Sequence, residues 1–209
     1  MRKAIKAYLK NFLRVSLPYV LLAGAYLGIG ELILSKKNIW ILIALFGAAS
    51  LVVSGVTVVD IWGSINNLKF GLPESFKYVI GKSPRLIFTM LIVLPGGLVL
   101  LYLFLNFFSF YLFIPLAFYP FFFIYLLPIL LLGEKGVLSF LRKSFDLAWY
   151  NPIKTGIITF LPAIVTGYLL AFGFQLVVFL FILPFWMSLI VSNYCEISEC
   201  IGPVNYFNG

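Results

Sequence analysis

Two long stretches of this chain carry no charged side chain, and they restrict its fold more than any other feature. Residues 86–133 contain no Asp, Glu, Lys or Arg over 48 positions, and residues 155–195 contain none over 41. An α-helix needs about 20 apolar residues to cross a bilayer, so each stretch is long enough for two crossings. Residues 15–34 and 39–59 each supply one more. Backbone polar groups in lipid must be paired within the chain. The sequence therefore predicts an all-α, polytopic membrane protein with six transmembrane helices.

Thirteen of the fifteen Lys and Arg residues fall in three clusters, each just before a pair of predicted spans. The clusters are Arg2, Lys3, Lys6, Lys10 and Arg14; Lys69, Lys77, Lys82 and Arg85; and Lys135, Arg142, Lys143 and Lys154. Short basic loops stay in the cytoplasm, so all three clusters are expected on that side. This predicts a multi-pass protein of the plasma membrane with cytoplasmic N- and C-termini. The net charge of +8 is then directed at the membrane surface, and no nucleic-acid partner is expected.

The basic clusters lie in segments with amphipathic helical spacing. In the first, Ile5, Tyr8, Leu9 and Phe12 recur on the face opposite the lysines. A second helix is expected over about 73–83 and a third over about 137–150. Their expected apolar faces are Phe76, Val79 and Ile80, and Leu138, Leu141, Phe145, Ala148 and Trp149. This pattern is typical of helices lying in the membrane interface, with apolar residues at the acyl boundary and cations at the phosphates.

The end of each amphipathic segment has a common form, in which a polar residue and a turn precede a cation. These junctions lie at residues 11–14, 83–85 and 151–154. A proline, Pro18, Pro95 or Pro162, then falls inside the first span of each pair, where it should bend the helix and free a carbonyl for a neighbouring helix.

The recurrence predicts one integral membrane domain, 1–209, made of three helical hairpins, each preceded by a basic interfacial helix. The units are about 1–65, 66–133 and 134–200, and a duplication would relate them by pseudo-threefold symmetry. Convergence is the alternative, because any protein built of membrane hairpins needs basic inner loops.

The fourth predicted span differs from the others in being strongly aromatic between residues 110 and 125. Pro115, Pro120 and Pro128 are expected to bend it. We expect this span to face lipid or another subunit, which makes it the candidate surface for a protein partner or a homo-oligomer.

The acidic residues and cysteines offer little for catalysis, and no catalytic residue or cofactor is assigned. None of the seven acids falls in the middle of a predicted span, where an ionisable group would indicate function. Asp60 ends the second span, and a salt bridge to a cation of a neighbouring unit is favoured there over a substrate site. After the last span, a helix would bring together four candidate metal ligands, although a polar helix end is the favoured interpretation. These are Cys195, Glu196, Glu199 and Cys200.

Residues 139–152, with the sequence SFLRKSFDLAWYNP, precede an apolar helix. This stretch resembles a group of six-span membrane families that includes the membrane domain attached to some glycerophosphodiester phosphodiesterases. The resemblance lies in the basic amphipathic helix, the Asn-Pro pair and the span that follows. It implies an accessory or lipid-associated membrane role, and no catalytic residue is carried over.

The sequence therefore favours a non-enzymatic membrane module, an accessory or permease-like subunit that engages anionic lipid or a cytoplasmic partner through its basic helices. The candidate binding residues are Lys3, Lys6, Lys10, Arg14, Lys77, Lys82, Arg85, Arg142, Lys143 and Lys154. A transporter or channel is the alternative, with a path between the hairpins lined by residues such as Thr89, Thr159 and Thr166. A membrane enzyme comes third and would need an acid or metal site near Asp60 or Cys195.

Overall fold

The computed structural model describes residues 2–34, 39–68, 71–107, 110–133 and 137–197. Within these ranges the chain forms helices joined by short turns and contains no β-strand. The helices are α1 (Arg2–Lys10), α2 (Phe12–Leu34), α3 (Ile39–Ile65), α4 (Leu72–Gly81), α5 (Ser83–Phe107), α6 (Phe110–Phe123), α7 (Leu126–Leu132), α8 (Val137–Tyr150), α9 (Pro152–Ala171), α10 (Gln175–Val177), the π-helix η1 (Val178–Ile182) and α11 (Leu183–Ile197). The predicted all-α class is confirmed.

Three helical segments of the described chain are long and apolar enough to cross a membrane. They are Phe46–Ile65 in α3, Pro152–Ala171, which is α9, and Gln175–Ile197, which runs through α10, η1 and α11.

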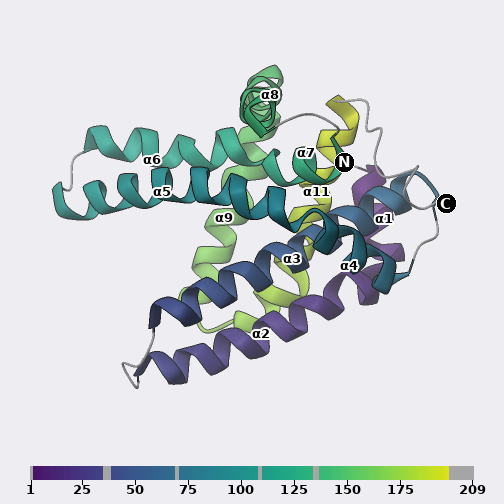
Figure 1. Ribbon diagram of the computed structural model, residues 1–209, viewed down its shortest axis with the longest axis horizontal. Helices are drawn as coiled ribbons and strands as arrows, with labels where there is room; N and C mark the ends of the chain where they lie inside the picture. The colour runs from purple at the N-terminus through teal and green to yellow at the C-terminus, as the bar shows by residue number, and fades with distance from the viewer. Residues whose placement is uncertain (1, 35–38, 69–70, 108–109, 134–136, 198–209) are drawn as a thin grey trace.

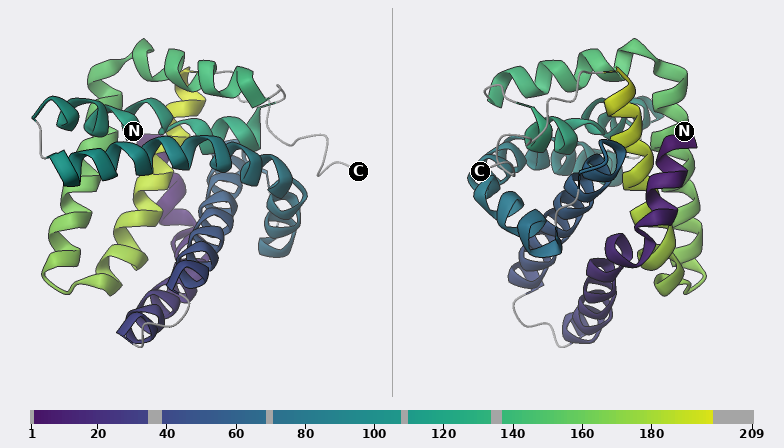
Figure 2. Two further views of the ribbon diagram at one scale, coloured as in Figure 1. Left: turned by 60° about the vertical axis from the view of Figure 1, so that its left-hand side comes forward. Right: turned by 90° about the vertical axis from the view of Figure 1, so that its right-hand side faces the viewer.

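The long helices pack in sequence-adjacent pairs, and different pairs point in different directions (Figures 1 and 2). Helix α2 runs alongside α3, and α5 alongside α6, while α9 contacts η1 and α11. Both figures show the α5–α6 pair lying across α9 rather than parallel to it. Helix α1 packs against α11 and α3, α4 against α3, and α8 against α6 and α7. Each of these short helices thus packs on helices other than the long helix that follows it in sequence.

The predicted junctions between short and long helices are confirmed. Helix α1 gives way to α2 at Asn11, α4 to α5 at Lys82, and α8 to α9 at Asn151. At the last of these, Asn151 Oδ1 accepts a hydrogen bond from the backbone N–H of Lys154 at 3.2 Å, and Pro152 occupies the first helical position. An amide acceptor at the N-cap and a proline after it are a strong helix-start signal, since both suit the unpaired N–H groups of the first turn.

A mid-helix proline frees a backbone carbonyl, as expected, and a neighbouring helix pairs with it. Pro162 has no N–H to donate to Ile158 four residues earlier. In the structure the Ile158 carbonyl accepts a hydrogen bond of 2.7 Å from Trp186 Nε1 of α11. The proline therefore helps to fix the position of α11 against α9.

The aromatic fourth span departs from expectation. It is split into α6 and α7 by a turn at residues 124 and 125, because Pro128 cannot donate to the carbonyl of Ile124. Pro115 and Pro120 lie within the continuous helix α6. The expectation that this span faces lipid or a subunit is wrong for its second half, because α7 is buried in the main core together with Phe121 and Tyr125.

The core packs the C-terminal half of α3 and α7 against α11 and α8. Its most deeply buried members include Val56, Ile61, Trp62, Ile129 and Tyr194. Small residues let these helices approach closely: a Cβ added at Gly55 would lie 2.9 Å from Val79 Cγ1 and 3.4 Å from Leu131 Cδ1.

The amphipathic helices α4 and α8 bury a second set of residues on protein, beside the apolar residues expected at the membrane. In α4 the buried residues are Ser75, Tyr78 and Val79, whereas Ile80 is exposed. The buried residues of α8 are Phe140, Ser144, Leu147 and Ala148. Phe145 and Trp149 of α8 are exposed at their edges but pack on Phe122, with ring centroids 4.5 and 6.3 Å from it. These helices therefore bury part of their surface on protein.

We predict that Gly55→Leu destabilises the protein by about 2 kcal/mol, because overfilling a packed helix contact forces side chains and backbone to shift. Gly47→Leu on the same helix is the matched control, since nothing lies within 4 Å of a Cβ there. Chemical unfolding in detergent micelles measures both. Equal stabilities for the two variants would show that α3 does not pack closely against α4 and α7.

Candidate functional site

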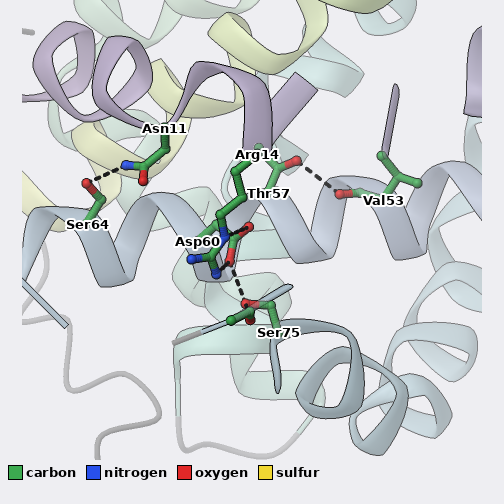
Figure 3. A network of polar contacts seen from close by, with 8 residues as sticks. Asn11, Arg14, Val53, Thr57, Asp60, Ser64 and Ser75 are labelled. Carbon is green, nitrogen blue, oxygen red and sulfur yellow. Dashed lines mark hydrogen bonds and ion pairs between the residues drawn. The ribbon is translucent and has the colours of Figure 1, made fainter. Parts of the chain in front are cut away.

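Three helices meet at a buried ionic network formed by Arg14 of α2, Asp60 of α3 and Ser75 of α4 (Figure 3). Arg14 Nη2 donates to Asp60 Oδ1 at 2.6 Å, and Arg14 Nε donates to Asp60 Oδ2 at 3.2 Å. Ser75 Oγ donates to Asp60 Oδ1 at 2.5 Å. The guanidinium thus donates to both carboxylate oxygens, which is the bidentate and most specific form of this ion pair.

The burial of this network makes its pairing obligatory. The Asp60 side chain is 1% exposed and the Arg14 side chain 31%. Removing a carboxylate from water is expensive unless a cation and hydrogen-bond donors replace the water. Ser75, itself fully buried, supplies the third donor. The site therefore holds α2, α3 and α4 in one relative position.

A second polar contact extends the network toward α1. Asn11, in the turn between α1 and α2, donates from Nδ2 to Ser64 Oγ of α3 at 2.7 Å. Tyr8 of α1 donates from its phenol to the carbonyl of Phe181 at 3.4 Å, and burial raises the pKa of this phenol. Helix α1 is thereby bonded to α3 and to η1.

Beside the network lies an open polar pocket of about 430 Å³. Its polar lining consists of Lys10, Asn11, Arg14, Asp60, Ser64 and Asn67. Two cations and one carboxylate leave one net positive charge. Arg14 uses two of its five N–H groups on Asp60. The lining thus combines cations with amide and hydroxyl donors, which is the donor set that binds an anionic group.

The end of α3 shapes the rim of this pocket. Asn67 adopts a left-handed backbone with φ 58°. The N–H of Leu68 reaches back to the carbonyl of Gly63 at 2.8 Å, and that of Asn67 to Ser64 at 3.4 Å. This is the Schellman arrangement, in which Asn tolerates the left-handed position better than most residues. It stops α3 and places Asn67 at the pocket.

The structure brings only part of the predicted basic set into this pocket. Lys10 and Arg14 line it. Lys6 is exposed on α1, which also carries Lys3, and Lys77, Arg85 and Arg142 are exposed elsewhere. Lys143 is half-buried on α8, and Lys82 Nζ lies 5.6 Å from the ring centroid of Tyr78. The ten residues do not form one continuous site.

The predicted salt bridge of Asp60 exists, but its partner was assigned wrongly. A cation from a neighbouring unit was expected, whereas Arg14 belongs to the same predicted unit, 1–65. Contact with the next unit comes instead from the uncharged Ser75. Asn66 does not join the site, because its side chain donates to the carbonyl of Trp62 at 2.9 Å.

A second buried polar group was missed by sequence reasoning. Tyr125 Oη is 3.0 Å from Thr155 Oγ1, and Asn193 Nδ2 donates to Tyr125 Oη. Nearby, Lys154 of α9 forms an ion pair with Glu196 of α11. A tyrosine between apolar residues gives no sign of its hydrogen-bond partner, so only the position of Asn193 near the end of the last span could have indicated this group.

The candidate metal site receives no support from the residues that the structure describes. The described residues contain no group of three or more metal-ligating Cys, Asp, Glu or His side chains. Cys195 packs against the main core and Glu196 is paired with Lys154, whereas Glu199 and Cys200 lie outside the described chain. Of the threonines expected along a transport path, Thr89 is buried and Thr159 donates to the Thr155 carbonyl at 2.8 Å.

Comparison with known proteins found no match: no protein-family model, no curated sequence and no solved structure corresponds to this chain.

We predict that Asp60→Leu lowers the free energy of unfolding by about 3 kcal/mol, because it leaves the Arg14 cation partly buried without its carboxylate. Adding Arg14→Met should restore most of that loss, since an apolar pair of similar size often replaces a buried ion pair at little cost. Unfolding by denaturant in detergent micelles measures both variants.

Asp146→Leu is the control. Its exposed ion pair with Arg142 spans 4.0 Å on α8, and loss of such a pair costs about 0.5 kcal/mol. Losses of equal size at Asp60 and Asp146 would contradict the structural role assigned to the buried pair.

Proposed function

We propose that this chain is a non-enzymatic membrane module that binds the anionic headgroup of a phospholipid in the pocket beside Arg14 and Asp60. The observation that carries the proposal is the lining of that pocket, which combines one net positive charge with the amides of Asn11 and Asn67. A phosphodiester matches these groups, because it carries one negative charge and accepts several hydrogen bonds. The volume of about 430 Å³ suits a headgroup rather than a whole lipid.

The proposed setting is the plasma membrane, with six spans, three basic interfacial helices and both termini in the cytoplasm. In addition to the three segments that meet the length and hydropathy requirement, α2, α5 and α6–α7 would insert. Exposed apolar side chains on α2 and α5, such as Leu13, Leu21, Ile87 and Leu91, support this, because a soluble surface rarely carries so much apolar area. The three units and their pseudo-threefold relation belong to the same proposal.

The basic helices outside the pocket would act as a second, weaker source of attraction. Lysines near an anionic bilayer surface each contribute about 1 kcal/mol, and the effect falls off within a Debye length. Lys6 and Lys77 are exposed on α1 and α4. They would hold the short helices at the headgroup level, whereas the pocket would select the lipid.

The transport alternative has one specific observation in its favour. An apolar pocket of about 360 Å³ lies between α2, α3, α9 and the η1–α11 segment, lined in part by Tyr19, Phe46, Phe179 and Trp186. Phe179 belongs to the π-helix, and π-helical turns are frequent at functional sites. A path for a substrate through the bundle would begin there.

We predict that Lys10→Gln weakens binding of phosphatidylglycerol about fivefold, because it removes the net charge of the pocket. Native mass spectrometry of the purified chain, titrated with that lipid in detergent, measures the change. Lys77→Gln is the matched control: it removes the same charge from an exposed position outside the pocket. Its effect should stay below about twofold, because a neutral detergent micelle has no anionic surface to attract an exposed lysine. Equal effects would assign lipid binding to general surface charge and overturn the pocket proposal.

A further inference from the structure

A second pocket, of about 350 Å³, lies between the start of α9 and the end of α11. Its lining includes Ile153, Lys154, Ile157, Ile158, Leu189 and Asn193. Unlike the first pocket, it is lined mainly by aliphatic side chains, with polar groups from few residues. Such a mixture suits a ligand with an apolar body and one polar end.

The most unusual member of this lining is Asn193, which is 2% exposed. Its Nδ2 donates to Tyr125 Oη, whereas its Oδ1 accepts no hydrogen bond from any residue of the described chain. A buried acceptor without a donor carries a desolvation cost, and a ligand that supplies the donor would remove it. The pocket therefore favours a ligand with a hydrogen-bond donor.

The charges at the pocket are balanced. Lys154 is ion-paired with Glu196, which lies one helical turn after Asn193, and their side chains are 36% and 40% exposed. Glu196 is not part of the pocket lining, but its ion pair with Lys154 neutralises the one cation that is. A net-negative headgroup would be attracted to Lys154 but repelled by Glu196. A headgroup that carries both signs can meet both partners.

The position of the pocket points to a lipid. Ile153 and Ile157 are exposed on the outer face of α9, and the same face carries the exposed residues Leu161, Ile164 and Tyr168. This continuous apolar stripe would contact acyl chains in the proposed membrane setting, with Lys154 at the start of the helix at headgroup level. A lipid chain could thus continue from the bilayer into the pocket.

We propose that this pocket binds a zwitterionic phospholipid with a primary ammonium headgroup, a phosphatidylethanolamine. Its phosphate accepts from Lys154 Nζ, its ammonium donates to Asn193 Oδ1 and faces Glu196, and an acyl chain lies against Ile157, Ile158 and Leu189. Phosphatidylcholine has the same charges, but its quaternary ammonium has no N–H to donate. The proposal rests on insertion of α9 and α11 in the membrane. It does not depend on the anionic-lipid pocket beside Arg14.

Native mass spectrometry of the full chain in detergent tests the proposal, using phosphatidylethanolamine, phosphatidylcholine and phosphatidylglycerol with identical acyl chains. We expect phosphatidylethanolamine to bind about fivefold more tightly than phosphatidylcholine, the effect of one gained hydrogen bond. Ile157→Trp, which fills the pocket from an exposed position, should abolish that preference. Glu196→Gln should reduce it.

Ile164→Trp is the matched control, because Ile164 is exposed on the same helix and is not part of the pocket lining. It should leave the preference intact. Equal binding of phosphatidylethanolamine and phosphatidylcholine by the unmodified chain would overturn the proposal, and so would equal loss in both tryptophan variants. If the Lys10→Gln test fails while the ethanolamine preference persists, only the anionic-lipid proposal fails. Phosphatidylglycerol binding that survives Ile157→Trp would separate the two sites.

Discussion

The buried ion pair between Arg14 and Asp60 is the interaction on which the N-terminal half of the structure depends. A carboxylate that is almost inaccessible to water at the end of an apolar helix is stable only with a cation and further donors around it. Arg14 and Ser75 meet that need, and they can do so only if α2, α3 and α4 converge. The pocket beside them follows from this convergence, since Lys10 ends α1 just before the turn into α2 and Asn67 lies just past the end of α3.

Buried polar groups also find their partners on neighbouring helices around α9 and α11, where hydrogen bonds rather than charges align the helices. Trp186 pairs with the carbonyl that Pro162 frees, and Tyr125 connects α9 to α11 through Thr155 and Asn193. In lipid, apolar side chains give little preference for one helix contact over another, so packing and polar contacts decide it. An apolar exterior with a few polar contacts inside is therefore sufficient to specify this arrangement.

The sequence predicted the features that depend on local chemistry, and the structure agrees with them. The start of α9 follows from the Asn151 cap and Pro152, and the all-helical class follows from the uncharged stretches. Features that depend on which helices pack together were harder to predict from the sequence. Many cations could have paired with Asp60, and spacing alone did not show that Arg14 would. Pro128 splits the fourth span because it cannot donate to the carbonyl of Ile124, just before the chain enters the core. The burial of the following helix cannot be judged from an aromatic run.

We propose that the basic clusters, and with them the anionic-lipid pocket, lie on one side of a membrane that the apolar helices cross. Labelling of single cysteines with a membrane-impermeant thiol reagent, in a Cys195→Ser/Cys200→Ser background, tests it most directly. We expect Lys77→Cys and Arg142→Cys to be labelled only from the cytoplasmic side, and Asn106→Cys and Phe172→Cys only from outside. The crossing of α5–α6 over α9 makes Asn106 the decisive position. Its labelling from the cytoplasmic side would contradict the six-span arrangement, and labelling of Lys77→Cys and Arg142→Cys from opposite sides would contradict the account as a whole.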